Sequence, residues 1–188
     1  MLEWHSPLSA AHLRKGRDGA DGRRLVRFAE VRGWSLTEVG VLPGYDVCVA
    51  ELLAAQVPSG SLKEARVYKI ASNQSWIAAR DLSLAATLTS ALPEETCTVT
   101  SLTHGRVRIA IAGAPVRAVL AKVLSIDLRH SSFGVGEYRL TGLHHIGVFV
   151  ERSDSDIYQF FLPRTFAQSL LEVLQDAALE FGYDVMAE

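Results

Sequence analysis

Four histidines in the second half of the chain are the side chains best suited to proton transfer or metal binding near neutral pH. His144 and His145 are adjacent at the start of a predicted strand. Because neighbouring strand residues point to opposite faces, we do not expect these two imidazoles to bind one metal ion together. His104 lies in a predicted hairpin turn and His130 in a polar loop. At both positions a hydrogen bond to the backbone is expected rather than acid–base catalysis.

Two further stretches resemble ligand-binding loops only in part. Asp154 and Asp156 alternate with serines, but a calcium-binding EF-hand loop also needs a third oxygen ligand, a central glycine and a distal glutamate. The run 134–137, Gly-Val-Gly-Glu, leads into a predicted strand, whereas a phosphate loop leads into a helix whose N-terminus holds the phosphate. We therefore predict a hairpin turn at the aspartates and no dinucleotide site at the glycines. Glu94 and Glu95 are expected in a solvated turn.

The sequence contains no assembled nucleophile, acid, base or metal-binding set. No Gly-x-Ser-x-Gly motif occurs, so the nucleophile elbow of a serine hydrolase is absent. The two cysteines, Cys48 and Cys97, are far apart and form no CxxC pair, so we expect both to be reduced, buried side chains. We predict no catalytic residue, no cofactor-binding residue and no metal ligand in this chain.

The charge balance argues against nucleic acid as the main partner. The chain has 188 residues, of which 48% are apolar and 21% charged, and its formal net charge is −2. A surface that binds phosphates needs a clear basic excess. Basic residues do cluster between positions 14 and 32, but Asp18, Asp21 and Glu30 are interspersed among them. A solvated arm or a subunit contact is therefore expected there.

The cellular location is predicted from what the sequence lacks. No stretch approaches the roughly 20 apolar residues of a membrane-spanning helix. Met1–Ala10 has neither the basic start nor the apolar run of a signal peptide. With two cysteines that are expected to be reduced, these features predict a cytoplasmic protein.

Hydrophobic periodicity from residue 65 onward predicts hairpins that alternate with helices. The predicted elements are a hairpin of 67–70 and 76–79, a helix from Asp81 or Ser83 to Ala91, a hairpin of 96–102 and 106–112, a helix from Pro115 to Val123, strands at 137–143, 145–152 and 157–162, and a helix over 166–181. This order is typical of an α+β fold with helices on one face of antiparallel sheet. The run from Trp76 to Val150 has the ferredoxin-like order β-α-β-β-α-β.

The first 62 residues are expected to form an N-terminal arm, and residues 63–188 the core domain. A break at Pro58-Ser59-Gly60-Ser61 sets the boundary. A strand is predicted within Val31–Leu42, and Tyr45–Gln56 is compatible with either a strand or a short helix. The bulky side chains Trp4, Leu8, Leu13 and Trp34 of the arm either fold back on the chain's own core or cover a neighbouring subunit. Truncation before Pro43 is accordingly expected to weaken assembly and to leave the core folded.

Several runs, taken in their order along the chain, resemble the gamma subunit of heterotetrameric sarcosine oxidase. They are 101–109, 113–122, Ser125-Ile126-Asp127-Leu128, Phe133 with Gly136, 160–167 and 176–182, together with the opening Ser6-Pro7-Leu8. The resemblance extends from about Tyr68 to the end of the chain and is thin between Arg14 and Lys63. The order and spacing of the runs carry it rather than any single motif.

The resemblance implies a fold related to the folate-binding aminomethyltransferases of glycine cleavage. It also implies partners: an alpha subunit that carries folate and NAD, a beta subunit that carries flavin, and a zinc-binding delta subunit. In such complexes the N-methyl group of sarcosine is oxidised at FAD, electrons pass through FMN to oxygen, and tetrahydrofolate captures the formaldehyde equivalent. The gamma subunit carries none of these cofactors, which agrees with the absence of a predicted site here.

One departure from the family pattern leaves alternatives open. Leu124-Ser125 stands where the family usually has Cys-Pro, so a related complex that acts on another N-methyl or secondary amine is an alternative. A second alternative is a stand-alone folate-binding or aminomethyl-transferring domain, for which Asp127 is the nearest candidate carboxylate. A third is a plain ferredoxin-like binding module.

Overall fold

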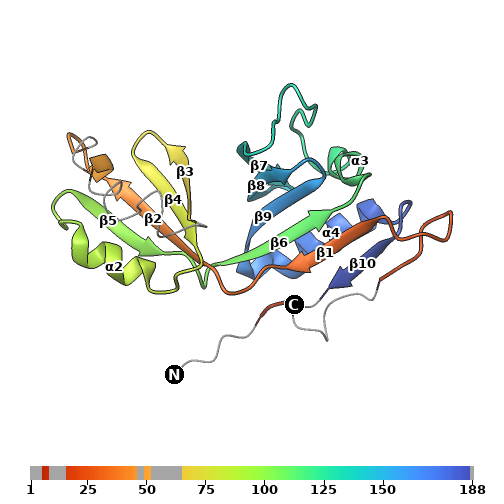
Figure 1. Cartoon of the computed structure of the whole chain (residues 1–188), viewed down its shortest axis with the longest axis horizontal. Helices are drawn as coiled ribbons and strands as arrows, with labels where there is room; N and C mark the ends of the chain where they lie inside the picture. Colours follow the sequence, from red (N-terminus) through yellow and green to blue (C-terminus); the bar gives the residue numbers. More distant parts are fainter. Residues whose placement is uncertain (1–5, 9–15, 46–48, 52–64, 187–188) are drawn as a thin grey trace. The chain divides into compact units, whose positions relative to one another are not determined.

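The computed structural model describes residues 6–8, 16–45, 49–51 and 65–186, and the chain divides into two compact units (Figure 1). Unit 1 combines Met1–Arg32 with Gly105–Glu188, and unit 2 is the continuous segment Gly33–His104 between them. This division differs from the expected arm over 1–62 and core over 63–188. The difference arises because strands from the first 62 residues are built into both sheets.

The described residues of unit 1 form a six-stranded sheet in the order β10-β1-β6-β9-β8-β7. Neighbouring strands are antiparallel except β1 and β10, which run parallel. The strands are β1 (Val26–Glu30), β6 (Arg106–Ala112), β7 (Tyr138–Leu143), β8 (Ile146–Asp154), β9 (Ile157–Pro163) and β10 (Tyr183–Met186). The predicted strands that became β7, β8 and β9 are confirmed within one or two residues at each end.

Alternation along β6 determines which face of this sheet the helices cover. Val107, Ile109 and Ile111 are buried, and the residues between them are partly exposed, as the two-residue period of a strand requires. The buried side chains join one core with residues of α3 (Val116–Ala121) and α4 (Ala167–Ala178). Figure 1 shows α4 along one face of the sheet. The expected α+β architecture, with helices on one face of antiparallel sheet, is confirmed.

The last helix is shorter than the predicted range 166–181. A 3-10 turn, η1 (Arg164–Phe166), precedes α4, and the α-helix ends at Ala178. Gly182 follows with φ +67°, a left-handed conformation that glycine adopts without the steric cost of a side chain. The chain then enters β10, a strand that the sequence pattern did not predict.

Of the two alternatives for residues 14–32, the solvated arm is wrong for the part that the structure describes, and the subunit contact stays a prediction. β1 lies between β10 and β6, and its side chains Val26 and Phe28 are fully buried. Ahead of β1, Arg17 and Tyr183 exchange two backbone hydrogen bonds of 2.7 Å. Charge content misled the prediction because Arg23 and Arg24 project into solvent from backbone that packs against the end of the chain.

Two of the bulky arm side chains are buried within the chain itself. Leu8 is 1% exposed and belongs to the core of unit 1, and Trp34 is 7% exposed. The Ser6 hydroxyl donates to Oε1 of the buried Glu30 at 2.5 Å, which fixes the segment next to Leu8. These contacts favour folding back for Leu8 and Trp34. Trp4 and Leu13 lie outside the described residues.

The described residues of unit 2 include a four-stranded sheet and the helix α2 (Leu84–Ala91) that packs on it. The strand order is β3-β4-β2-β5, all antiparallel. The core beneath the helix includes Val39, Ile77, Leu84 and Leu88. Ser83, one of the two predicted caps, occupies the N-cap position, but its side chain makes no capping hydrogen bond to the helix; Asp81 accepts hydrogen bonds from the backbone and hydroxyl of Ser83. The elements are β2 (Ser35–Val41), β3 (Arg66–Ala71), β4 (Gln74–Ala79), α2 (Leu84–Ala91) and β5 (Cys97–Ser101).

The predicted hairpin between β5 and β6 is wrong. β5 pairs with β2 in unit 2, whereas β6 pairs with β1 and β9 in unit 1. The segment 103–105 crosses from one unit to the other instead of closing a hairpin. The β-α-β-β-α-β order from Trp76 to Val150 is therefore present along the chain but divided between two sheets. Of the ambiguous segment Tyr45–Gln56, residues 49–51 are helical, and much of the rest lies outside the described residues.

Candidate interaction surface

His144 and His145 form the two-residue turn between β7 and β8, and not the start of a strand as predicted. Leu143 pairs with Ile146 across the turn, and the two histidines have φ values of +47° and +66°. Positive φ at both central residues is the geometry of a type I′ turn, which favours Asn-Gly. Both imidazoles are exposed. Two L-residues with full side chains are therefore held in a left-handed conformation.

Replacing His144-His145 with Asn-Gly is expected to raise the free energy of unfolding of the full chain by about 1–2 kcal/mol, because the left-handed conformation costs most residues about that much. Urea denaturation followed by circular dichroism measures the change. The Ala-Ala variant removes both imidazoles without relieving the backbone, so we expect it to give no such gain. An Asn-Gly variant no more stable than the native chain would show that the turn is not strained.

The other two histidines lie apart from each other along the chain, and both are exposed. His104 lies in the segment that crosses between the two units. His130 lies in the loop after α3, where partial desolvation and then the positive charges of Arg117 and Arg152 lower the pKa of its imidazole. These surroundings therefore favour the neutral form of the His130 imidazole. Backbone capping by these two imidazoles stays a prediction.

The two loops that partly resemble ligand sites are parts of hairpins. Asp154 ends β8, and Asp156 immediately precedes β9, so the predicted hairpin turn is confirmed. The Gly136 N–H donates to the Arg152 carbonyl at 2.7 Å, and the Arg152 N–H donates to the Glu137 carbonyl at 2.9 Å. The glycine-containing loop thus extends the pairing of β7 with β8.

Among the residues that the structure describes, no group of three His, Cys, Asp or Glu side chains lies close enough to hold a metal ion. Cys97 is a free, buried thiol, as expected, and Cys48 lies outside the described residues. Glu94 and Glu95 are exposed in the turn before β5, as predicted. No helix in the described ranges has the length and apolar character needed to cross a membrane.

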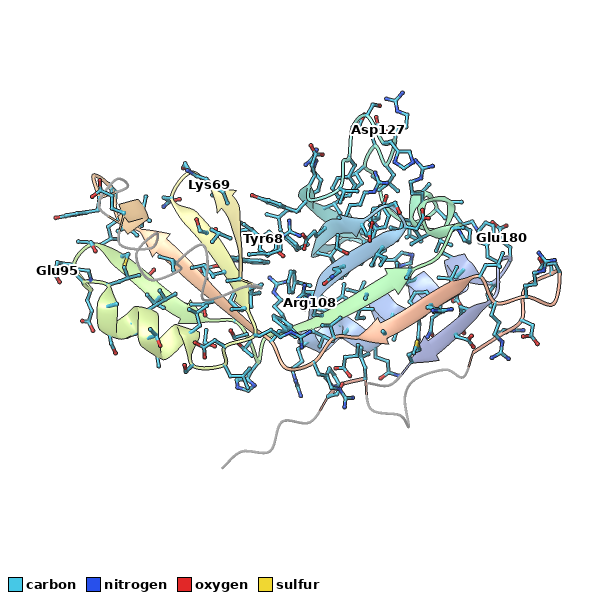
Figure 2. The ribbon with its side chains drawn as sticks, viewed as in Figure 1. Tyr68, Lys69, Glu95, Arg108, Asp127 and Glu180 are labelled. Carbon is cyan, nitrogen blue, oxygen red and sulfur yellow. The ribbon has the colours of Figure 1, made fainter. Side chains whose placement is uncertain are left out.

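Asp127, the candidate carboxylate for folate, is bound by its neighbour Arg129. The Arg129 guanidinium donates to Oδ2 at 2.5 and 2.9 Å, and the Arg129 backbone N–H donates to Oδ1 at 3.0 Å. These hydrogen bonds, the side-chain ones first, hold the pKa of the Asp127 carboxyl well below its usual range. Asp127 is therefore a stable anion on an exposed loop (Figure 2), already committed to a local partner.

A shallow depression of about 400 Å³ lies on unit 1 between this loop and α3. Charged groups come from both walls, and small or branched apolar side chains lie between them. Sequence reasoning singled out only Asp127 here, because the remaining residues come together through the packing of α3 against the loop. We call this surface the α3 depression; its lining residues are Arg117, Ala118, Ala121, Ile126, Asp127, Leu128 and Arg129.

A buried arginine, Arg152, is a second feature that sequence reasoning missed. Its side chain is 2% exposed, and its guanidinium donates to the carbonyls of Phe133 and Ser155 at 2.9 and 2.8 Å. The same guanidinium lies 5.9 Å from the centre of the Tyr158 ring. Its position could have been found from the two-residue period of a strand, since Arg152 shares one face of β8 with Val148 and Val150, and residues 148–152 are all buried. Arg152 therefore places a buried positive charge close enough to His130 to affect its pKa.

The comparisons with known proteins concern the family and the fold of the chain. Residues 68–180 match the model of the sarcosine oxidase, gamma subunit family. A chain of the heterotetrameric sarcosine oxidase from Corynebacterium sp. U-96, in complex with pyrrole 2-carboxylate, superposes with a TM-score of 0.80 and 26% identity. That match covers 95% of this chain and 96% of that chain. No protein of curated function matches the sequence.

A second solved structure, the glycine cleavage system aminomethyltransferase T from Bartonella henselae, superposes with a TM-score of 0.61 and 19% identity. The match covers 88% of this chain and 48% of that chain. At this identity the likeness concerns the fold alone, and it confirms the expected relation to the aminomethyltransferase fold.

Proposed function

Because the chain belongs to the sarcosine oxidase gamma subunit family, we propose that it acts as the gamma subunit of a heterotetrameric, flavin-dependent complex that oxidatively demethylates sarcosine to glycine. The one-carbon unit passes to tetrahydrofolate in this proposal. The observation that carries it is the superposition on a chain of heterotetrameric sarcosine oxidase over nearly the full length of both chains. The partners are the alpha, beta and delta subunits of a cytoplasmic complex.

In this proposal the chain itself is not catalytic and holds no cofactor. FAD, FMN, NAD, tetrahydrofolate and zinc are assigned to the other subunits. Two observations support this assignment. His104, His130 and the His144-His145 pair occupy three separate loops, and the carboxylate of Asp127 is already bound by Arg129. The chain therefore contributes folded surface to the complex.

Oxidation of another N-methyl or secondary amine by a related complex is the second candidate, favoured by Leu124-Ser125 in place of Cys-Pro. Leu124 is 6% exposed, packs in the core of unit 1 and forms an isolated bridge with Leu143, whereas Ser125 is exposed. Sarcosine is the first substrate to test because the chain superposes on a chain of a sarcosine oxidase. The stand-alone folate-binding module loses support because Asp127 lacks a free carboxylate.

Affinity purification of the tagged full chain from its native cells tests the proposal. We expect three further polypeptides and a flavin absorbance spectrum to co-purify, and we expect sarcosine to bleach that spectrum under anaerobic conditions. The chain expressed alone is expected to show no flavin absorbance and no turnover. Adding other N-methyl and secondary amines to the same complex separates the two candidate substrates, because the true substrate reduces the flavin at the lowest concentration.

Two results would contradict the proposal. A tagged chain that purifies as a stable monomer, without a flavoprotein, would remove the subunit role. Turnover or tight flavin binding by the isolated chain would remove the non-catalytic assignment and leave the subunit role standing.

A further inference from the structure

The outer side of α3 permits close approach by another chain. Val116, Val119 and Leu120 face inward and are fully buried in the core of unit 1. The outward residues Ala118 and Ala121 are exposed, and each presents only a methyl group. A segment that enters the α3 depression can therefore reach the helix backbone closely and contact Ile126 on the far wall.

The charges around the α3 depression do not balance. Asp127 is neutralised by the guanidinium of Arg129. No hydrogen bond or ion pair joins Arg117 to another residue in the described part of the chain. Arg152, buried nearby, is hydrogen-bonded to carbonyl oxygens, which leave its positive charge in place. The charged residues that line the depression are Arg117, Arg129 and Asp127, so the lining is net positive although the chain carries a net charge of −2.

The titration of the neighbouring histidine agrees with this electrostatic picture. Arg117 and Arg152 both lower the pKa of the His130 imidazole, after the effect of desolvation, and Asp156 opposes them. Two guanidinium groups thus act on His130, the residue that follows Arg129 in the chain, and one carboxylate opposes them.

We propose that the α3 depression docks an acidic segment of another subunit of the oxidase, with a carboxylate paired to Arg117 and an apolar side chain against Ala118, Ala121 and Ile126. The inference rests on the proposed function, because that function requires the other subunits that could supply the acidic segment. Charge complementarity selects the occupant: covering Arg117 without a carboxylate would leave a desolvated, unpaired cation, which is costly. A bidentate carboxylate offsets that cost and fixes the orientation of the partner.

The shape of the surface argues for a protein segment over a small free anion. Small-molecule sites enclose most of the surface of their ligand, whereas the α3 depression is shallow and open on its solvent side. A continuous segment can use the apolar contacts and the arginine at once. A free carboxylate or phosphate could use only the arginine.

Two substitutions in the depression, each with a matched control elsewhere, test the proposal in the co-purification experiment on the full chain. Arg117→Glu reverses the charge, and Ala118→Tyr fills the groove. Arg23→Glu is the charge control. The Arg23 side chain is 75% exposed in unit 1, and its ion pair with Asp21 is long at 3.8 Å and therefore weak. Ala86→Tyr is the size control on the exposed side of α2. Thermal unfolding by circular dichroism confirms that all four variants are folded.

We expect Arg117→Glu and Ala118→Tyr each to reduce the amount of co-purified partner by about tenfold or more, which is the scale for loss of one buried charge pair. The controls are expected to stay within about twofold of the native chain. Raising the salt concentration is expected to weaken assembly of the native chain and to have little further effect on Arg117→Glu.

Other outcomes overturn the proposal in distinguishable ways. Native-level assembly of both depression variants would show that this surface is not an interface, while the subunit role stands. Loss of assembly with Ala118→Tyr alone would show an interface whose partner is not acidic. Failure of the native chain to bring down any partner would remove the proposed function and, with it, this inference.

Discussion

Gly182→Ala is expected to lower the free energy of unfolding by about 3 kcal/mol or more. A Cβ at position 182 would lie 2.0 Å from the Arg23 carbonyl oxygen and 2.4 Å from the Gly19 nitrogen. Both neighbours are backbone atoms, so neither can turn away as a side chain could. The backbone at Gly182 also has φ +67°, which adds a conformational cost for alanine.

Gly22→Ala is the control that separates the two costs expected at Gly182, the steric clash of the new Cβ and the left-handed backbone conformation. Gly22 has φ +73°, nearly the same backbone angle, but a Cβ there would meet no atom within 4 Å. We expect this variant to lose only about 1–2 kcal/mol. Equilibrium urea denaturation of the full chain measures both. Equal losses at the two positions would show that the contact between residues 17–24 and the turn at 182 is not tight.

Phe28→Ala is expected to cost about 3–5 kcal/mol, the usual range for removing a fully buried phenylalanine. Phe28 is 1% exposed, and its ring meets Tyr183 of β10 edge to face at 5.6 Å. Arg27→Ala, one position earlier on the exposed side of β1, is the matched control and is expected to change stability by no more than about 0.5 kcal/mol. Denaturation midpoints of the two variants decide whether β1 is a core strand.

Deleting residues 1–32 removes β1 altogether and so tests on a larger scale whether this strand belongs to the core. The sequence favoured an arm whose truncation leaves the core folded, whereas the structure places β1 between β10 and β6. We now expect the deletion to unfold unit 1, because it separates β10 from the sheet and opens the core around Val26 and Phe28. Near-ultraviolet circular dichroism monitors the loss. A shortened chain with native spectrum and cooperative unfolding would restore the arm interpretation.

Local patterns predicted the parts of the fold that depend on neighbouring residues. The alternation of Arg106–Ala112 and the apolar stripe of α4 each lie within one element, and the polar turns between β3 and β4 and between β8 and β9 directly join their strands. β1 and β10 escaped prediction because they pair with each other although their sequences are far apart. Short strands of this kind are stabilised by long-range pairing, and their own composition carries little information.

The candidate surface was harder to predict than the fold. Arg117 stands on the outer side of a short helix and Arg129 in a loop, and only tertiary packing brings them to one depression. Arg152 could have been noticed as a charge that shares one face of β8 with Val148 and Val150. The turn at His144 and His145 lacked its usual Asn-Gly signature, so the histidines looked like the start of a strand.

The insertion of unit 2 between the two parts of unit 1 sets the order in which a ribosome can complete the molecule. Residues 33–104 contain every described strand of their sheet, so this unit can close as soon as it has emerged. β1 is made earlier but must wait for β6 and then for β10, near residue 186, before both its edges are covered. Contacts that need the finished six-stranded unit therefore form later in synthesis than the contacts within unit 2.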